Sequence, residues 1–311
     1  MRAARYPSDS REPEELVRTR TQGAGQTPVE RLEQLIASVW PKDESIAAIA
    51  VAAPGPLDPY QGVILSAPNI PGWEDLHLRE ILTERFRVPI ALGNDANLAG
   101  LGEWRFGAGQ GHHHLIYITV STGIGGGVII DDRLLLGSHG MAAELGHVTV
   151  DVGGPVCGCG QRGHLEALAS GTAIAHWVQE QLEAGRVSSL SGKDLIDTRL
   201  VSQEAKAGDG LAREALRRAG YYLGIGIASF LHIFNPTAVI IGGGVSQSGP
   251  LLFDPLREIL REVVLTPDYL EDLTLTTAAL GDQSGLMGAL ALARSIDPAN
   301  EDRPVLNLQI E

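Results

Sequence analysis

Apolar and polar positions along the chain follow two different periods, which predict helices alternating with buried strands. Residues 27–30 supply an N-cap threonine, a proline at the first helical position and a reciprocal glutamate. Apolar side chains then recur on one face as far as Val39, which predicts an amphipathic helix. The continuous apolar runs Ile46–Ala53 and Val88–Leu92 predict buried strands. The second run leads into a predicted helix at Ala96–Trp104.

The rest of the chain repeats this alternation. Residues up to Gln26 are compatible with a pair of strands, and Leu115–Ser121 and Gly127–Ile130 are expected to form a hairpin around residues 122–126. The remaining predicted elements are helices Ala167–Gly185 and Gly210–Phe234, strand Thr237–Ile241, a helix from Pro250, strand Leu273–Ala278 and helix Ser284–Arg294, with a loose tail after Ile296. Small residues at Gly220, Gly224 and Gly226 are expected to allow close helix packing. This order of elements predicts an α/β architecture with mixed sheets.

Composition narrows the classes of function. The 311 residues are 44% hydrophobic and 20% charged, which is typical of a soluble globular protein. Lysine and arginine total 24 against 38 acidic residues, so a net charge of -14 disfavours a nucleic-acid partner. No apolar run approaches the roughly 20 residues needed to span a bilayer, and the first residues lack a signal-type apolar core. We therefore expect a cytoplasmic protein with no membrane partner.

The most specific cluster in the sequence is a set of four metal-ligand side chains. The chain has two cysteines, Cys157 and Cys159, flanked by His147 and His164. Two thiolates and two imidazoles make a full tetrahedral set, which predicts a structural Zn²⁺ site with no open position for catalysis. The alternative is two buried thiols beside unrelated histidines. A histidine tract at residues 112–114 is interpreted as an exposed loop, because no thiol or carboxylate completes it locally.

Three other clusters suit a phosphoryl-transfer site. Asp95 stands where a strand ends and a helix begins, so its carboxylate could accept a proton from a bound hydroxyl or could only cap the helix. The run Ser121–Gly127 offers backbone N–H groups and hydroxyls to a phosphate. Gly242–Gly244 follows a buried strand and could let a nucleotide approach, although a tight strand-to-helix turn explains it equally well.

Together these motifs resemble the ROK family of sugar kinases, repressors and uncharacterised open reading frames. The resemblance extends in order from about Glu15 to Leu292 and rests on the segments Asn94–Asn97, Leu101–Trp104, Thr119–Gly127, Glu144–His147, Cys157–Gly160 and Leu165–Ala167. It implies an actin-like ATPase (ribonuclease H-like) fold of two lobes with mixed sheets and a cleft between them. The implied lobes are residues 1–114 completed by 283–296, and residues 115–282 with the zinc motif, followed by a tail at 297–311.

The resemblance also implies an activity and a set of site residues. Asp95 would take the proton from the 6-hydroxyl of a hexose as that oxygen attacks the γ-phosphate of ATP, with Mg²⁺ present. The implied sugar-binding residues are Asn69, Asn94, Asp95, Glu144, His147 and Glu166, and the implied nucleotide-binding residues are Thr122, Gly123, Gly125, Gly242, Gly243 and Gly244. Glucose is the expected sugar, which implies a glucokinase of glycolysis. Relatives are often homodimers.

Alternative functions remain open from the sequence. The sugar could be another hexose or an N-acetylhexosamine, because the same carboxylates could hold it. The repressors of the family carry a DNA-binding domain ahead of the kinase-like part, and the acidic charge argues against that class here. A further alternative is a sugar-binding remnant without catalysis.

The sequence departs from the family pattern at three places. His164 stands where the family usually has a third cysteine, and Ala143 replaces a frequent glycine. Relatives also begin with a strand and an Asp-x-Gly-Gly-Thr phosphate loop, whereas residues 1–4 here resemble the strand that follows that loop. We therefore expect that roughly ten to fifteen residues are missing and that the chain as written is impaired. A start codon assigned too far downstream is favoured over a decayed copy, because every later motif is intact.

Overall fold

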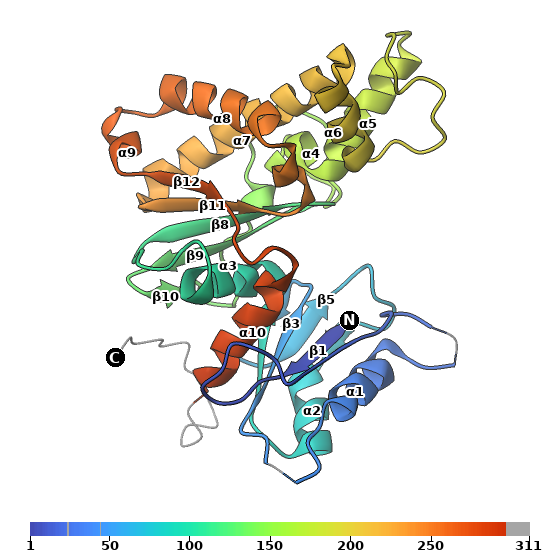
Figure 1. Ribbon diagram of the computed structural model, residues 1–311, viewed down its shortest axis with the longest axis vertical. Helices are drawn as coiled ribbons and strands as arrows, with labels where there is room; N and C mark the ends of the chain where they lie inside the picture. The colour runs from blue at the N-terminus through green and yellow to red at the C-terminus, as the bar shows by residue number, and fades with distance from the viewer. Residues whose placement is uncertain (24, 44, 297–311) are drawn as a thin grey trace. The chain divides into compact units, whose positions relative to one another are not determined.

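The computed structural model describes residues 1–23, 25–43 and 45–296 (Figure 1). The chain divides into two compact units, and each is described by itself. Unit 1 comprises Met1–Gly111, Gly127–Ala143 and the segment from Asp282 onward, and unit 2 comprises His112–Gly126 and Glu144–Gly281. The expected tail at 297–311 lies outside the described residues. Among the described helices, none has both the length and the apolar character needed to cross a membrane.

Unit 1 is built from short strands and from helices of nine to twelve residues, of which α1, α3 and α10 were predicted from the sequence. Its elements are β1 (Arg2–Arg5), β2 (Glu15–Arg18), α1 (Pro28–Ser38), β3 (Ile49–Ala53), β4 (Leu57–Asp58), β5 (Val63–Ser66), β6 (Glu74–Leu76), α2 (Leu78–Phe86), β7 (Ile90–Asn94), α3 (Asp95–Phe106), β10 (Arg133–Leu134) and α10 (Ser284–Arg294). The Thr27 capping box forms as expected, with reciprocal hydrogen bonds between Thr27 and Glu30. The strand pair expected before Gln26 is confirmed as β1 and β2, which are antiparallel.

Two pairs of strands in unit 1 matter for the site. β1 pairs with β2, and β3 pairs in parallel with β7 through the register Ile49↔Ile90 to Ala53↔Asn94. Side chains of β3 are only half-buried apart from Ala53, whereas Ile90 to Gly93 of β7 are buried. The apolar run of β3 was expected to be fully buried. The difference arises because these half-buried residues line a groove of unit 1.

Helices α3 and α10 pack together through glycines. A side chain at Gly102 would meet the backbone of Ser284 and Gly288, and one at Gly288 would meet the Leu98 carbonyl. Ser284 donates to the buried carboxylate of Glu103 at 2.9 Å, and the Ala108 N–H donates to the same carboxylate at 3.0 Å. This close packing fixes the helix on which Asp95 stands.

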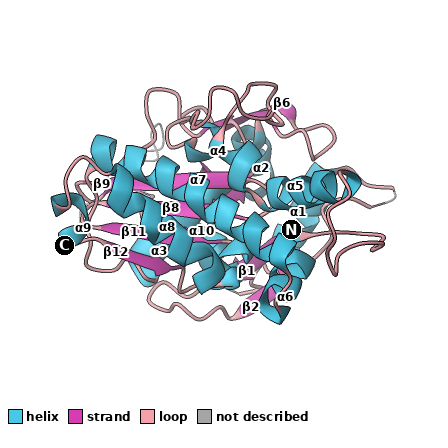
Figure 2. Cartoon of the chain, turned by 90° about the horizontal axis from the view of Figure 1, so that it is seen from above, coloured by secondary structure: helices cyan, strands magenta, loops and turns pink. Residues whose placement is uncertain are grey.

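Unit 2 holds strands β8 (Leu115–Val120), β11 (Ala238–Gly242) and β12 (Thr274–Thr277), with β11 parallel to both neighbours. Its helices are α4 (Leu165–Ala169), α5 (Gly171–Glu183), α6 (Thr198–Ala207), α7 (Gly210–Phe234), α8 (Pro250–Val263) and α9 (Asp268–Glu271), with the 3-10 helices η1 (Leu145–His147) and η2 (Gly244–Ser248). Helices α7 and α8 cover one face of these strands (Figures 1 and 2). β9 (Ile124–Ile130) begins in unit 2 and ends in unit 1, and the full sheet order is β10-β9-β8-β11-β12.

Glycines again set the helix packing in unit 2, as the sequence predicts. A side chain at Gly220 would approach the Leu252 carbonyl, and one at Gly226 would lie 2.8 Å from Leu165 Cδ2. The boundaries of α7 and α10 match the expected ranges. The helix expected at Ala167–Gly185 is instead two helices, because Ser170 leaves the helix and caps α5 by accepting from the Ala173 N–H at 3.1 Å.

Candidate active site and metal centre

Asp95 is the first residue of α3, and Asn94 is its N-cap. The Asn94 side-chain oxygen accepts from the N–H groups of Ala96 at 3.0 Å and Asn97 at 3.2 Å. Asn94 is therefore the N-cap of α3, and Asp95 stands in the first turn of the helix. The same hydrogen bonds engage the Asn94 side-chain oxygen, and the role of Asn94 toward a sugar stays a prediction.

The environment of Asp95 suits a proton acceptor. The residue keeps exposed surface at the end of β7. Even so, the surrounding protein desolvates its carboxyl, and this raises the pKa of Asp95 above the usual value for an aspartate, against the opposing effect of the N–H groups of Ala96 and of Asp95 itself. A carboxylate whose pKa is raised binds a proton more readily than an ordinary aspartate.

Asn69 also lies in unit 1, on an exposed turn. Its backbone carbonyl accepts from the Gln22 side chain at 3.1 Å. The turn is closed by hydrogen bonds from Ala67 to the Trp73 carbonyl at 2.8 Å and from Ile70 to the Ala67 carbonyl at 2.8 Å. The Asn69 side chain is therefore carried on an ordered turn with access to solvent.

Unit 2 carries the glycine-rich hairpin between β8 and β9. Its tip is Ser121–Gly123, shorter than expected, because Gly125 and its neighbours belong to β9. The Ser121 N–H donates to the Gly123 carbonyl at 2.9 Å. The N-terminus of α5 holds the outer side of the tip, with Gly171 donating to the Ser121 carbonyl at 2.7 Å and the Thr172 hydroxyl to the Thr122 carbonyl at 2.8 Å. The Thr122 side chain remains exposed.

Glu166 joins this hairpin to the cysteine loop. One carboxylate oxygen accepts from the Ile124 N–H at 2.9 Å, and the other lies 3.6 Å from Cys157 Sγ. A Cβ at Gly123 would stand 2.5 Å from the first oxygen, so Gly123 is required by the close approach of Glu166. Glu166 therefore contacts both the hairpin and one of the two cysteines.

The turn at Gly242–Gly244 follows β11. Gly243 has φ +82, a conformation that favours glycine, and its carbonyl accepts from the Ser246 hydroxyl at 2.7 Å. A side chain at Gly242 would collide with the Tyr117 ring, whereas one at Gly244 would meet open space. The backbone conformation of the turn is therefore enough to explain glycine at position 243. A role of the turn in nucleotide binding stays a prediction.

The four expected metal ligands come together in unit 2. The ligand atoms of His147, Cys157, Cys159 and His164 all lie within 4.8 Å of one another. Cys157 Sγ is 3.8 Å from His147 Nδ1, and Cys159 Sγ is 3.3 Å from His164 Nδ1. These separations bracket the ~3.6 Å between sulfur and nitrogen ligands of a tetrahedral zinc ion. The cluster can hold a metal ion.

A short loop presents the two thiols. Cys157 donates its N–H to the Gln161 carbonyl at 2.7 Å, and Gly160 donates back to the Cys157 carbonyl at 2.8 Å with φ +91. Isolated bridges Val156↔Arg162 and Thr149↔His164 extend this pairing to the histidine. Burial raises the pKa of the Cys157 thiol to about 11, and the charge of Glu166 adds to the effect. A bound dication would favour the thiolate instead.

Glu144 precedes η1 and is exposed, and its carbonyl accepts from the His147 N–H at 3.0 Å. Ala143 before it adopts φ +67, in the left-handed region. That conformation explains physically why glycine is frequent there in the family pattern. The sequence did not identify Thr172 or Ser170, which anchor the hairpin tip and α5, because lone hydroxyl residues before a helix give no motif.

The site residues are thus divided between the units. Asn69, Asn94 and Asp95 lie in unit 1, and all other predicted residues lie in unit 2. A family model described as "ROK family" matches residues 9–296. The chain belongs to the ROK family.

Individual relatives support this assignment. Glucokinase of Thermotoga maritima is 37% identical over 270 residues, covering 86% of this chain and 84% of that protein. A solved ROK family glucokinase from Streptomyces griseus, in complex with glucose and AMPPNP, matches with a TM-score of 0.77 and 34% identity over 91% of this chain and 92% of its own. The xylose repressor of Caldicellulosiruptor bescii is 34% identical over 255 residues, 81% of this chain and 63% of the repressor. The expected actin-like ATPase fold of the ROK sugar kinases is confirmed.

Replacing Ala143 by glycine should stabilise the protein by about 1 kcal/mol, because the left-handed conformation costs a residue with a Cβ roughly that much. Urea unfolding of Ala143→Gly measures this gain. Ala142→Gly is the matched control, since Ala142 is not among the residues with positive φ, and it should lose stability. A loss of stability in Ala143→Gly would contradict the conclusion that the backbone is strained at Ala143.

Replacing Gly123 by alanine should displace the Glu166 carboxylate while leaving stability within about 1 kcal/mol, because the carboxylate is the flexible end of its side chain. The Ile124 amide would then lose its acceptor and exchange with solvent roughly tenfold faster. Gly153→Ala is the control, since its Cβ would lie 3.7 Å from the nearest atom. Unchanged exchange at Ile124 would show that Glu166 does not hold the hairpin.

Proposed function

We propose that this protein transfers the γ-phosphoryl group of ATP to the 6-hydroxyl of glucose. The observation that carries the proposal is the Asp95 carboxyl, relieved of capping by Asn94 and with its pKa raised. Two relatives add support, the glucokinase of Thermotoga maritima and the Streptomyces griseus glucokinase solved with glucose and AMPPNP. Both of these relatives are named as glucokinases, and both are similar in length to this chain.

In the proposed reaction the hexose 6-hydroxyl oxygen attacks the γ-phosphorus of ATP. The bond from that phosphorus to the bridging oxygen breaks, ADP leaves, and Asp95 takes the hydroxyl proton. Mg²⁺ bound with the nucleotide would offset the negative charge of the phosphates. The carboxylic acid formed on Asp95 then returns its proton to solvent. Asn69, Glu144, His147 and Glu166 are proposed to hold the sugar hydroxyls. Thr122, Gly123, Gly125 and the turn Gly242–Gly244 are proposed to face the nucleotide.

We also propose that the four-ligand cluster binds one structural Zn²⁺. His147, Cys157, Cys159 and His164 supply the two imidazoles and two thiolates that tetrahedral zinc prefers. The ion would fix the loop that bears Cys157, and through it the position of Glu166. A cytoplasmic location suits both the ATP requirement and the reduced thiols.

Turnover should first be measured with a coupled enzyme assay that detects the ADP released. The assay compares glucose, other hexoses and N-acetylhexosamines as substrates. The assay uses this chain and a form extended upstream to the next in-frame start. Turnover of glucose in either form supports the proposal, and a preference for another sugar shifts it to that kinase. Absence of turnover in both forms, with glucose still raising the Tm, would instead indicate a sugar-binding protein.

Asp95→Ala in the active form should lower kcat by at least ~1000-fold while glucose binding persists, because the proton acceptor is lost. In the unaltered enzyme, kcat/KM should fall as the pH drops through the pKa of Asp95, which lies above the usual value, because only the carboxylate accepts a proton. Glu84→Gln, an exposed carboxylate on α2, is the control and should leave both unchanged. Turnover within a few-fold of normal in Asp95→Ala would exclude Asp95 as the base.

Protein purified without a histidine tag should contain about one zinc per chain. His164→Cys should retain the metal, because a thiolate replaces an imidazole in the same set, whereas His164→Ala and Cys157→Ala should lose it. Elemental analysis measures the zinc, and the Tm with and without chelator measures its contribution to folding. A folded, metal-free protein whose Tm ignores both chelator and added zinc would overturn the assignment.

A further inference from the structure

The break between α4 and α5 releases backbone groups that one continuous helix would pair. In an unbroken helix the Thr172 N–H would donate to the Leu168 carbonyl, four residues earlier. Here it donates to the Thr122 carbonyl at the hairpin tip, at 3.3 Å. The Gly171 N–H likewise donates to the Ser121 carbonyl at 2.7 Å. The released donors therefore hold the hairpin tip, and the Leu168 carbonyl needs a donor from elsewhere.

Arg218 of α7 supplies that donor. Its Nη1 donates to the Leu168 carbonyl at 3.1 Å. Leu168 is fully buried and Arg218 is half-buried, so the hydrogen bond is partly shielded from water. A charged donor also makes a stronger hydrogen bond than a neutral one. Because α4, α5 and α7 pack on one another in unit 2, one side chain of α7 can reach both sides of the break (Figure 1).

Two aromatic rings orient the Arg218 guanidinium. Its Cζ lies 4.9 Å from the centroid of the Tyr222 ring on α7 and 5.8 Å from that of the Trp177 ring on α5. At these distances a cation is attracted to the face of an aromatic ring. Arg186 approaches the same Trp177 ring at 6.0 Å and pairs with Glu214 through hydrogen bonds of 2.6 and 3.1 Å. Because a lysine ammonium has no plane to stack on a ring, these contacts favour arginine at position 218.

The position of Glu166 depends on how α4 is held. Glu166 lies two positions before Leu168 in this helix of five residues. So short a helix has little stability of its own, and contacts with its neighbours determine where it lies. The Glu166 carboxylate accepts from the Ile124 N–H at 2.9 Å and lies 3.6 Å from Cys157 Sγ. A shift of α4 would therefore move the carboxylate away from both groups.

Tyr222 adds a contact to the loop that precedes α4. Its hydroxyl lies 3.4 Å from Asp151 Oδ2. The Asp151 N–H in turn donates to the Gly163 carbonyl at 3.2 Å, directly before His164. The residues that surround the Arg218 guanidinium therefore contact the helix that carries Glu166 and the loop that leads into it.

We propose that Arg218 is a positioning residue, which fixes α4 against the start of α5 and so holds the Glu166 carboxylate and the hairpin tip in place. It acts through the Leu168 carbonyl and the aromatic rings of Trp177 and Tyr222. The inference rests on the proposed function for its effect on turnover, because Glu166 is proposed to hold the sugar. The placement of α4 can be measured without turnover.

Amide hydrogen exchange tests the placement. Arg218→Met removes the donor and the planar cation, and exchange at Gly171, Thr172 and Ile124 should become roughly tenfold faster. Arg217→Met, which removes the same charge from an exposed position of α7, should leave the three amides unchanged. Arg218→Lys keeps the charge and a donor but cannot stack, so it should give an increase of about threefold. It carries the test if Arg218→Met fails to fold.

The Ile240 amide, in the buried strand β11 of the same unit, is the internal control for unfolding of the whole unit. Its exchange should not change in Arg218→Met. Unchanged exchange at the three amides, or equal acceleration at Ile240, would overturn the proposal.

Kinetics of the active form separate positioning from general stability. Arg218→Met should raise the KM for glucose by at least ~10-fold with a smaller loss of kcat, because Glu166 is displaced from the sugar. Loss of folded protein would instead lower the apparent kcat at constant KM, and that result would overturn the proposal. In Arg218→Ala, about 20 mM ethylguanidinium, far below the molar concentrations that unfold proteins, should restore part of the glucose affinity. If no form turns over any sugar, the proposed function fails, and the exchange result still decides the role of Arg218.

Discussion

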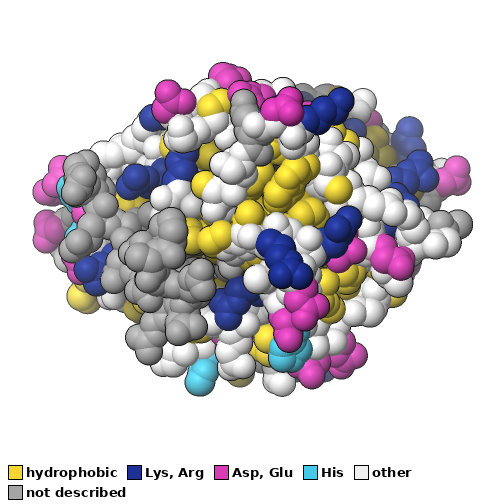
Figure 3. Space-filling view, turned by 90° about the horizontal axis from the view of Figure 1, so that it is seen from below, with side chains coloured by type: hydrophobic (Ala, Val, Ile, Leu, Met, Phe, Trp, Pro, Cys, Tyr) yellow, Lys and Arg dark blue, Asp and Glu magenta, His cyan; other side chains and the backbone are white. Residues whose placement is uncertain are grey.

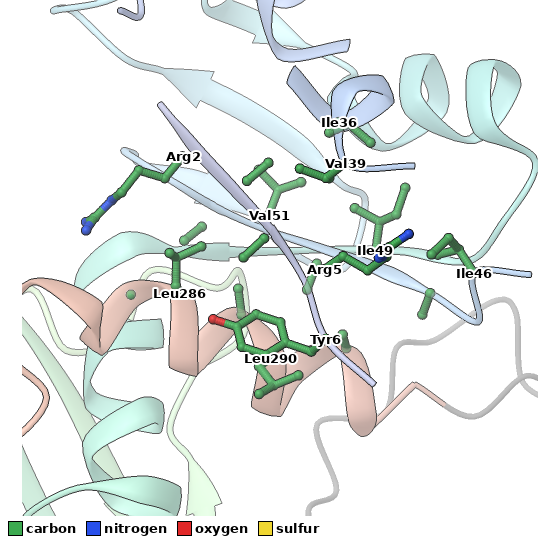
Figure 4. Close-up of a pocket in the computed structure, with 18 of the residues that line it drawn as sticks. Arg2, Arg5, Tyr6, Ile36, Val39, Ile46, Ile49, Val51, Leu286 and Leu290 are labelled. Carbon is green, nitrogen blue, oxygen red and sulfur yellow. The ribbon is translucent and has the colours of Figure 1, made fainter. Parts of the chain in front are cut away.

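Pairing of the strand edges in unit 1 is the constraint on which the rest of that unit depends. β1 pairs with β2 and β3 pairs with β7, and both β1 and β3 line a groove that is also lined by apolar side chains of α1 and α10 (Figure 4). The residues Ile49 to Ala52 of β3 are half-buried where they line this groove. Hydrophobic side chains also gather on the face shown in Figure 3, with Lys and Arg around them.

The position of Asp95 follows from the same part of the fold. β7 delivers it, Asn94 caps α3 in its place, and α10 packs closely on α3 through Gly102 and Gly288. In unit 2 a comparable chain of contacts runs from Cys157 to Glu166 to the Ile124 N–H. Cys157, the Glu166 carboxylate and the hairpin are therefore linked by direct contacts. Glycine at position 123 is needed for the close approach of Glu166 to the hairpin.

Much of this could be predicted from the sequence where a local pattern determines the structure. Local residue spacing was enough to predict the capping box at Thr27, the full length of α7 and the four metal-ligand side chains. The sequence could not predict that Asn94, and not Asp95, is the N-cap of α3, because asparagine and aspartate are equally favoured at that position. The break at Ser170 and the early start of β9 depend on tertiary hydrogen bonds from α5 to the hairpin tip. The groove depends on strands far apart in the chain.

The central claim is phosphoryl transfer from ATP to one particular hydroxyl of a hexose. The most direct measurement incubates the 311-residue and longer forms with ATP and glucose labelled with ¹³C at carbon 6, and records the carbon spectrum of the product. The account predicts a carbon-6 resonance split by coupling to phosphorus in at least one form, with formation of ADP in equal amount. ATP consumed without that splitting, or a phosphate on another carbon, would contradict it.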